Sequence, residues 1–89
     1  MKSVDVVIQN KLGLHARAAA KLVQLSNQFS SKITLIKDAE HADAKNMMEV
    51  LMLAGTQGTP LRVTADGGDA EEALAEIAQL IGNKFEEEE

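Results

Sequence analysis

The stretch LGLHARAAAKL, residues 12 to 22, is where the chain changes from the two-residue repeat of a strand to the repeat of a helix. It opens with a glycine-containing loop and runs into an alanine-rich segment, and His15 and Arg17 lie at the junction. The first four amide N–H groups of a helix lack partners inside the helix, and together with the helix dipole they attract anions. We therefore expect a helix that begins at Ala16 and an anion site at its start.

The apolar residues on either side of this stretch predict seven elements in the order β-α-β-β-α-β-α. Alternation of apolar and polar residues is typical of a strand with one buried face, as at Val4, Val6 and Ile8. Apolar residues three or four positions apart are typical of an amphipathic helix. Strands are expected at residues 4–8, 32–37, 41–44 and 60–66, and helices at residues 16–26, 47–53 and 70–85.

The size of the chain and the order of its elements favour one small α+β domain. The 89 residues correspond to a single domain, and a chain this short buries only ~60–65% of the surface that it exposes when unfolded. The predicted strands are few and are interrupted by helices, so the economical packing is a mostly antiparallel sheet with helices on one face. The domain is expected to span residues 1–89, and the four glutamates at 86–89 are expected to form a solvated, flexible tail.

Two polar residues are expected to cap helices. Asn46 precedes the short helix predicted at residues 47–53 and is suited to its N-cap. Asp69 precedes the last helix, and Glu72 follows three positions later, which resembles a capping box with Asp69 as the N-cap.

Composition and charge exclude several classes of protein. A formal charge of −5, two phenylalanines and no tyrosine or tryptophan argue against nucleic-acid binding. Without cysteine there is neither a disulfide nor a cysteine-ligated zinc site. No apolar run approaches ~20 residues and no leader-like segment is visible, so we expect no membrane insertion and a place in the cytoplasm. His41 has acidic neighbours, but a solvated surface is favoured over a metal site, and no metal or other cofactor is expected.

His15 and Arg17 suit reversible phosphorylation. Histidine changes its charge near neutral pH, and neutral imidazole is a nucleophile there. The guanidinium of Arg17 offers a fork of donors that matches phosphate oxygens. A lone histidine at the start of a helix can also be a simple cap or a surface residue. From these residues alone, both interpretations stay open.

The segment Gly13-Leu14-His15-Ala16-Arg17-Ala18-Ala19 resembles the active-site signature of the HPr family, the histidine-containing phosphocarriers of the bacterial phosphotransferase system. Residues 42–63 are similar to the second signature of the family, and the length and element order also fit. The resemblance implies an open-faced β-sandwich, βαββαβα, with a four-stranded antiparallel sheet covered on one face by three helices.

The resemblance also implies a function in which the chain carries a phosphoryl group and is not itself an enzyme. Phosphorylated enzyme I, with phosphoenolpyruvate as the original donor, would phosphorylate Nδ1 of His15, and His15 would pass the group to an EIIA-type protein. Arg17 would lie on the phosphate side, and the backbone amides of Ala16 and Arg17 would donate hydrogen bonds to the group.

The chain departs from the family pattern at two positions. Ala18 stands where the family usually has proline, which presets the backbone in a first helical turn, so its absence should loosen the start of the helix. Asn46 stands where many members have a regulatory serine, and asparagine is not a substrate of the kinase that modifies it. The block LMLAG resembles NPr, the nitrogen-branch paralogue, so three alternatives stay open: sugar uptake, nitrogen-related regulation, or one carrier that serves both.

A set of apolar residues on the first two predicted helices is expected to dock partner proteins, as those helices do in the family. Methionine adapts to several partners in turn. Met48 and Met52 fit a docking role and a core role equally, whereas a core position is favoured for Leu51 and Leu53. A monomer is expected. The docking set comprises Ala16, Ala20, Met47, Met48, Leu51 and Met52.

Two other functions compete with the carrier. A non-catalytic regulatory interaction module could keep the same fold, but it is expected to have lost His15 or Arg17, and both are present. A small phosphatase-like enzyme would need a second acid–base group or a metal cluster, and none stands near His15 in the sequence. The carrier is therefore favoured over the regulatory module and over the phosphatase-like enzyme.

Overall fold

The computed structural model describes residues 1–87 and follows the predicted order of elements. In this range a short 3₁₀ turn follows the last helix. The elements are β1 (Lys2–Val7), α1 (Ala16–Ser26), β2 (Lys32–Lys37), β3 (Glu40–Asp43), α2 (Met47–Met52), β4 (Pro60–Asp66), α3 (Ala70–Gly82) and η1 (Lys84–Glu86).

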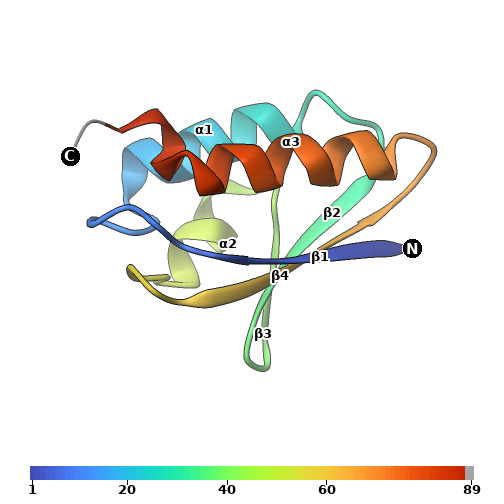
Figure 1. Ribbon diagram of the computed structural model, residues 1–89. Coiled ribbons are helices and arrows are strands. Elements are labelled where there is room, and N and C mark those ends of the chain that lie inside the picture. The colour runs from blue at the N-terminus through green and yellow to red at the C-terminus, as the bar shows by residue number, and fades with distance from the viewer. Residues whose placement is uncertain (88–89) are drawn as a thin grey trace.

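The four strands form one antiparallel sheet in the order β1-β4-β2-β3. Figure 1 shows α1 and α3 side by side on one face of this sheet. The short helix α2 packs against α1 and β3. This arrangement confirms the open-faced α+β sandwich that the resemblance implied.

The core lies between the sheet and the two long helices. Leu22 of α1, Ile33 of β2, Val63 of β4 and Ile77 of α3 are all fully buried. Burial of an aliphatic side chain of this size stabilises a fold by about 1.5–3 kcal/mol. The sheet contributes alternate residues and the helices contribute residues three and four apart, which is why the two repeats of the sequence predicted the fold.

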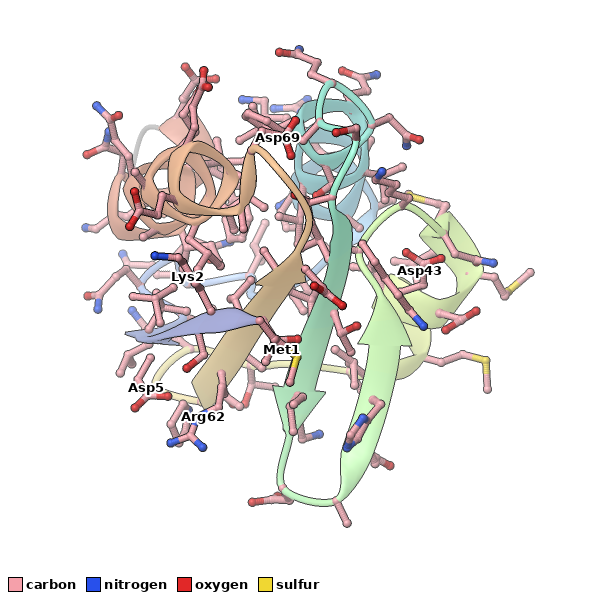
Figure 2. The ribbon with its side chains drawn as sticks, turned by 90° about the vertical axis from the view of Figure 1, so that its right-hand side faces the viewer. Met1, Lys2, Asp5, Asp43, Arg62 and Asp69 are labelled. Atoms are coloured by element: carbon pink, nitrogen blue, oxygen red, sulfur yellow. The ribbon has the colours of Figure 1, made fainter. Side chains whose placement is uncertain are left out.

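The face of the sheet that is turned away from the helices carries polar side chains. Asp5 of β1 lies opposite Arg62 of β4, and the Nε of Arg62 donates a hydrogen bond of 2.9 Å to the Asp5 carboxylate. Figure 2 shows both side chains pointing away from the helices. The hydrogen bond from Arg62, together with its charge, holds the pKa of Asp5 below its usual value. Because the pair is exposed, it contributes little to stability.

The two predicted caps have different outcomes. The Oδ1 of Asn46 accepts a hydrogen bond of 3.1 Å from the backbone N–H of Glu49, which confirms Asn46 as the N-cap of α2. The capping box at Asp69 is wrong, because Asp69 precedes α3 without any side-chain hydrogen bond to that helix.

The carboxylate of Asp69 instead holds the loop between α1 and β2. It accepts hydrogen bonds from the backbone N–H of Ser30 at 2.8 Å and of Ser31 at 3.0 Å, and from the Ser31 hydroxyl at 2.5 Å. The chain approaches this loop closely at Gly67, where an added Cβ would lie 2.7 Å from the Cα of Ser31. Among residues 1–87 these two loop amides have no other acceptor, and the Asp69 carboxylate bonds to them and not to the first turn of α3.

We expect Asp69→Asn to lower the melting temperature near neutral pH and to have no effect in strong acid. The hydrogen bonds from the Ser31 side chain and the Ser30 backbone are the main causes that lower the pKa of Asp69 to about 2. A carboxylate whose pKa is lower in the folded state stabilises the fold above its unfolded pKa, and this contribution is lost as pH falls from about 4 to about 2.

Thermal unfolding followed by circular dichroism at about pH 7, 4 and 2 measures this dependence. Glu72→Gln is the matched control, because Glu72 is the second residue of the rejected capping box and lies in the first turn of α3, where its charge contributes only a small interaction with the helix dipole. An equal loss for Asp69→Asn at all three pH values, or a loss for Glu72→Gln as large as that for Asp69→Asn, would contradict this assignment.

Candidate functional site

His15 is the N-cap of α1, and its ring folds back over the first turn of the helix. The backbone is extended there, with φ −76° and ψ 175°. Nδ1 of the ring accepts a hydrogen bond of 3.3 Å from the backbone N–H of Arg17, and the carbonyl oxygen of His15 accepts one of 2.8 Å from Ala19. The side chain is 27% exposed, so a reactant can reach the ring while the helix fixes its direction.

The loop before His15 is fixed by close packing on the segment after α2. Gly13 has a φ of 65°, and an added Cβ would lie 2.2 Å from the carbonyl oxygen of Gly55. The same oxygen accepts a hydrogen bond of 2.9 Å from the backbone N–H of Leu14, whose side chain is buried. Only glycine satisfies both the conformation and the space at residue 13, and the loop delivers His15 at a defined place.

The side chain of Arg17 is exposed on the first turn of α1, next to His15. Within residues 1–87 this side chain makes no hydrogen bond or ion pair. Ala16 beside it is also exposed, whereas Ala18 is fully buried against the core. The helix begins at Ala16, as predicted, and a looser first turn caused by Ala18 stays a prediction.

The structure adds two residues to the site that the sequence did not indicate. The Glu87 carboxylate hydrogen-bonds Nε2 of His15 through one oxygen and accepts a hydrogen bond of 2.7 Å from Asn10 through the other. Its side chain is only 10% exposed. The expectation of a solvated tail is therefore wrong at Glu87, and residues 88 and 89 lie outside the described part of the chain.

The neighbours of Glu87 favour the ionised form of its side chain. Partial burial raises the pKa of Glu87, but hydrogen bonds from His15 and Asn10 lower it, as do the charges of His15 and Arg17. The net effect is a pKa below the usual value for glutamate. The side chain is therefore a carboxylate at neutral pH.

The predicted docking residues lie on two helices, α2 and the first half of α1. Met48 and Met52 are 67% and 73% exposed, so they are not core residues, and their docking role stays a prediction. The preference for a core position holds for Leu53, which is buried, and is wrong for Leu51, which is exposed. The six-residue helix directs one side to the core, with Val50 buried. In the rest of the predicted set, Ala16 is exposed, and Ala20 and Met47 are half-buried.

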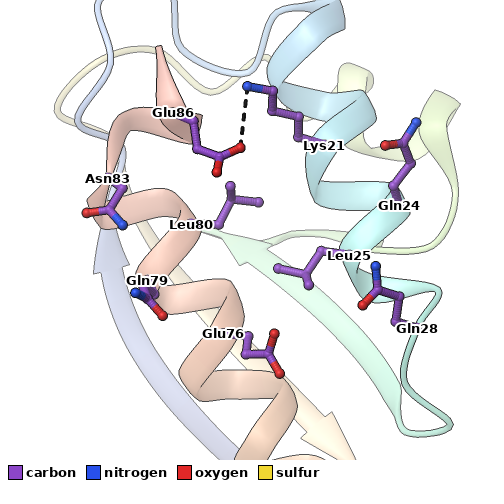
Figure 3. A pocket seen from close by; sticks show the side chains of 9 residues that line it. All are labelled: Lys21, Gln24, Leu25, Gln28, Glu76, Gln79, Leu80, Asn83 and Glu86. Carbon is purple, nitrogen blue, oxygen red and sulfur yellow. Dashed lines mark ion pairs between the residues drawn. The ribbon is translucent and has the colours of Figure 1, made fainter. Parts of the chain in front are cut away.

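A separate groove lies between α1 and α3, on the side of the molecule drawn in Figure 3. Amide side chains line much of it, and the Nζ of Lys21 lies 3.6 Å from Glu86 at one end. His15 does not line the groove, and neither does Arg17. The groove therefore contributes no group to the chemistry of His15. Its lining residues are Lys21, Gln24, Leu25, Gln28, Glu76, Gln79, Leu80, Asn83 and Glu86.

His41, the other histidine, is exposed on β3 and lies opposite Ile36 of β2. Within residues 1–87, no three histidine, aspartate or glutamate side chains gather in a way that could hold a metal ion. In the same range, every helix is too short or too polar to cross a membrane.

Comparison with known proteins identifies one family across almost the whole chain. The family described as "PTS HPr component phosphorylation site" matches residues 2–83. The chain is 44% identical over 84 residues to "Phosphocarrier protein HPr" of Xylella fastidiosa, which covers 94% of each protein. It is 42% identical over 83 residues to "Phosphocarrier protein NPr" of Shewanella violacea, which covers 93% of this chain and 91% of that protein.

Solved structures give the same result. A crystal structure described as HPr-C-His from Thermoanaerobacter tengcongensis matches with a TM-score of 0.96 and 44% identity, over 100% of both chains. A second crystal structure from that organism, described as an HPr dimer, matches with a TM-score of 0.79 over 98% of this chain and all of the other.

Proposed function

The chain belongs to the HPr family of phosphocarrier proteins of the phosphotransferase system, and from this we propose that Nδ1 of His15 is the atom that carries the phosphoryl group. The other histidine is not favoured, because His41 lies within a strand and does not cap a helix, whereas His15 is the N-cap of α1. His15 is therefore the acceptor that both the family and the geometry favour.

The hydrogen bond from the Arg17 amide to Nδ1 is the observation that carries this proposal. It requires a lone pair on Nδ1, which is the electron pair that attacks phosphorus. A phosphoryl group on Nδ1 would then lie beside the N–H groups of the first turn of α1, where the helix dipole favours negative charge. The guanidinium of Arg17 is exposed on the same turn and suits the phosphate oxygens.

In this proposal two partner proteins complete the reaction. Phosphorylated enzyme I supplies the phosphoryl group, which originates from phosphoenolpyruvate, and an EIIA-type protein removes it. The chain itself acts as a carrier with a phosphohistidine intermediate, not as an enzyme, and it acts as a monomer in the cytoplasm. The exposed side chains of Met48, Leu51 and Met52 would provide the surface on which both partners dock in turn.

The similarity to both HPr and NPr proteins leaves the sugar and nitrogen branches as the two sources of partners. A non-catalytic regulatory module is not favoured, because the histidine, the arginine and the helix start that serve phosphorylation are all in place. Asn46, at the position of the regulatory serine, caps α2 and offers no hydroxyl group.

A two-stage transfer assay tests the proposal. The chain is incubated with phosphoenolpyruvate and enzyme I of the sugar branch or of the nitrogen branch, and its intact mass is measured. The purified product is then mixed with an EIIA protein of the same branch. We expect one acid-labile phosphoryl adduct with at least one enzyme I, and its loss to the EIIA protein. An unmodified chain with both enzymes would refute the carrier function.

A further inference from the structure

We propose that Glu87 is a positioning residue for the phosphorylation of His15: its carboxylate keeps the ring proton on Nε2 and leaves Nδ1 as the nucleophile. This inference rests on the proposed function and adds a residue, with its support, to the same site. It follows from the contacts of both ring nitrogens, from the burial of Asn10 and from the turn that delivers Glu87.

The two ring nitrogens of His15 have partners of opposite kind. Nδ1 faces the backbone N–H of Arg17, which can only donate, so Nδ1 accepts. Nε2 faces the carboxylate of Glu87, which can only accept while ionised, so Nε2 donates. A neutral imidazole carries one proton, and both contacts place it on Nε2. Two independent contacts therefore select the form of the ring that can attack through Nδ1.

Asn10 fixes the orientation of the Glu87 carboxylate. Its side chain is fully buried, and its Nδ2 donates to the carbonyl oxygen of Gly13 at 2.8 Å and to Glu87 at 2.7 Å. Both partners are acceptors, so the amide cannot be reversed without losing both hydrogen bonds. Its Oδ1 is left without a partner within residues 1–87. Burying an oxygen without a hydrogen-bond partner costs free energy. The two hydrogen bonds donated by the Asn10 Nδ2 offset this cost and tie the loop before His15 to Glu87.

A left-handed turn brings Glu87 to this place. Lys84, Phe85 and Glu86 have φ values of 57°, 54° and 63°, a conformation that residues other than glycine rarely adopt. The fully buried side chain of Phe85 holds the turn, and the Nζ of Lys21 donates a hydrogen bond of 2.8 Å to the carbonyl oxygen of Phe85. An unfavourable backbone persists only where the surrounding structure holds it. Here the turn follows α3, packs against α1 and places Glu87 beside His15.

The carboxylate would act in both directions of transfer. In the first, the Nδ1 lone pair forms a bond to phosphorus while the phosphorus–nitrogen bond of the donor phosphohistidine breaks, and the electron pair of that bond stays with the donor. The proton remains on Nε2, so the product is an imidazolium next to the Glu87 carboxylate. In the second, a nucleophile of the EIIA-type protein forms a bond to phosphorus while the bond between phosphorus and Nδ1 breaks. The electron pair of the broken bond returns to Nδ1, and His15 is left as neutral imidazole with its proton on Nε2. The acidic residue of a catalytic triad serves a histidine in the same way.

Three variants separate this role from a merely structural one. Glu87→Ala removes the acceptor from Nε2. In Glu87→Gln, the single amide oxygen is held by Asn10, so the NH₂ group faces Nε2 and favours a proton on Nδ1, where it blocks attack. Glu86→Gln is the matched control, because Glu86 contacts Lys21 and not His15. Circular dichroism establishes that each variant is folded.

Nitrogen-15 chemical shifts of the ring at neutral pH, without any partner protein, report which nitrogen carries the proton. We expect the proton on Nε2 in the unchanged chain and in Glu86→Gln, a mixture in Glu87→Ala, and a shift towards Nδ1 in Glu87→Gln. The rate of phosphorylation by enzyme I should fall about 10-fold in Glu87→Ala and further in Glu87→Gln, though by less than the ~10⁴-fold loss for a fully buried triad.

Unchanged ring shifts and unchanged rates in both Glu87 variants would overturn the inference. A loss of rate with unchanged ring shifts would also overturn it, because Glu87 would then act on the docking of enzyme I. If enzyme I does not phosphorylate even the unchanged chain, the proposed function fails. The shifts measured without enzyme I still decide whether Glu87 places the proton.

Discussion

Replacement of His15 by alanine is expected to abolish phosphorylation by enzyme I and phosphoenolpyruvate, whereas replacement of His41 should leave it unchanged. His15 is the N-cap of α1, with Nδ1 at the first turn and Arg17 beside it. His41 is exposed within strand β3 and does not cap a helix. The loss should be complete because no other residue at the start of α1 offers a nitrogen lone pair.

Intact-mass spectrometry before and after brief acid treatment tests this prediction, because it measures whether an acid-labile phosphoryl adduct is present. Phosphohistidine is lost in acid, whereas phosphate esters of serine and threonine survive the treatment. The His41→Ala chain is the control for general effects of a lost imidazole. An adduct that remains on His15→Ala, or one that disappears in His41→Ala, would contradict the assignment of the phosphorylated residue.

The second large effect is on stability, at Phe85. Its side chain is fully buried although it follows the end of α3, and it packs into the core between the sheet and the helices. We expect Phe85→Ala to lower the free energy of unfolding by about 3–5 kcal/mol, the usual range for a buried phenylalanine. A domain of 89 residues has a total stability of roughly 4–13 kcal/mol, so the variant is expected to lose a large share of its stability and to unfold at a much lower urea concentration.

Urea denaturation followed by circular dichroism measures the loss, with Leu12→Ala as the control. Leu12 is 71% exposed, and its replacement should change the stability by no more than about 0.5 kcal/mol. Because Phe85 holds the turn before Glu87, the folded fraction of Phe85→Ala should also show a mixed position of the His15 ring proton. A loss below about 1 kcal/mol would mean that Phe85 is not a core residue in solution.

The fold could be predicted from the sequence because its elements follow simple repeats. Val4 and Val6 mark a strand, and Ile77 and Ile81 mark a helix, whatever the rest of the chain does. The cap at Asn46 was also predictable, because donor and acceptor lie three residues apart. The assignment of the site to His15 and Arg17 likewise depended on a contiguous motif.

The parts that the sequence did not predict all depend on distant contacts. Asp69 lies next to α3, but two serines almost forty positions earlier in the chain take its carboxylate. Glu87 is separated from His15 by 72 positions and reaches it through a left-handed turn, which no repeat indicates. Within a run of glutamates the only available signal was Phe85, an apolar residue that continues the pattern of α3 and anchors the segment.

The most direct test of the account is a nitrogen–phosphorus NMR measurement on the phosphorylated chain labelled with nitrogen-15 in histidine. We predict a scalar coupling between phosphorus and Nδ1 of His15, with a proton on Nε2 while Glu87 is present. A coupling to Nε2 of His15, or to either ring nitrogen of His41, would contradict the account, because Glu87 would then lie against the reacting atom or the site would be elsewhere.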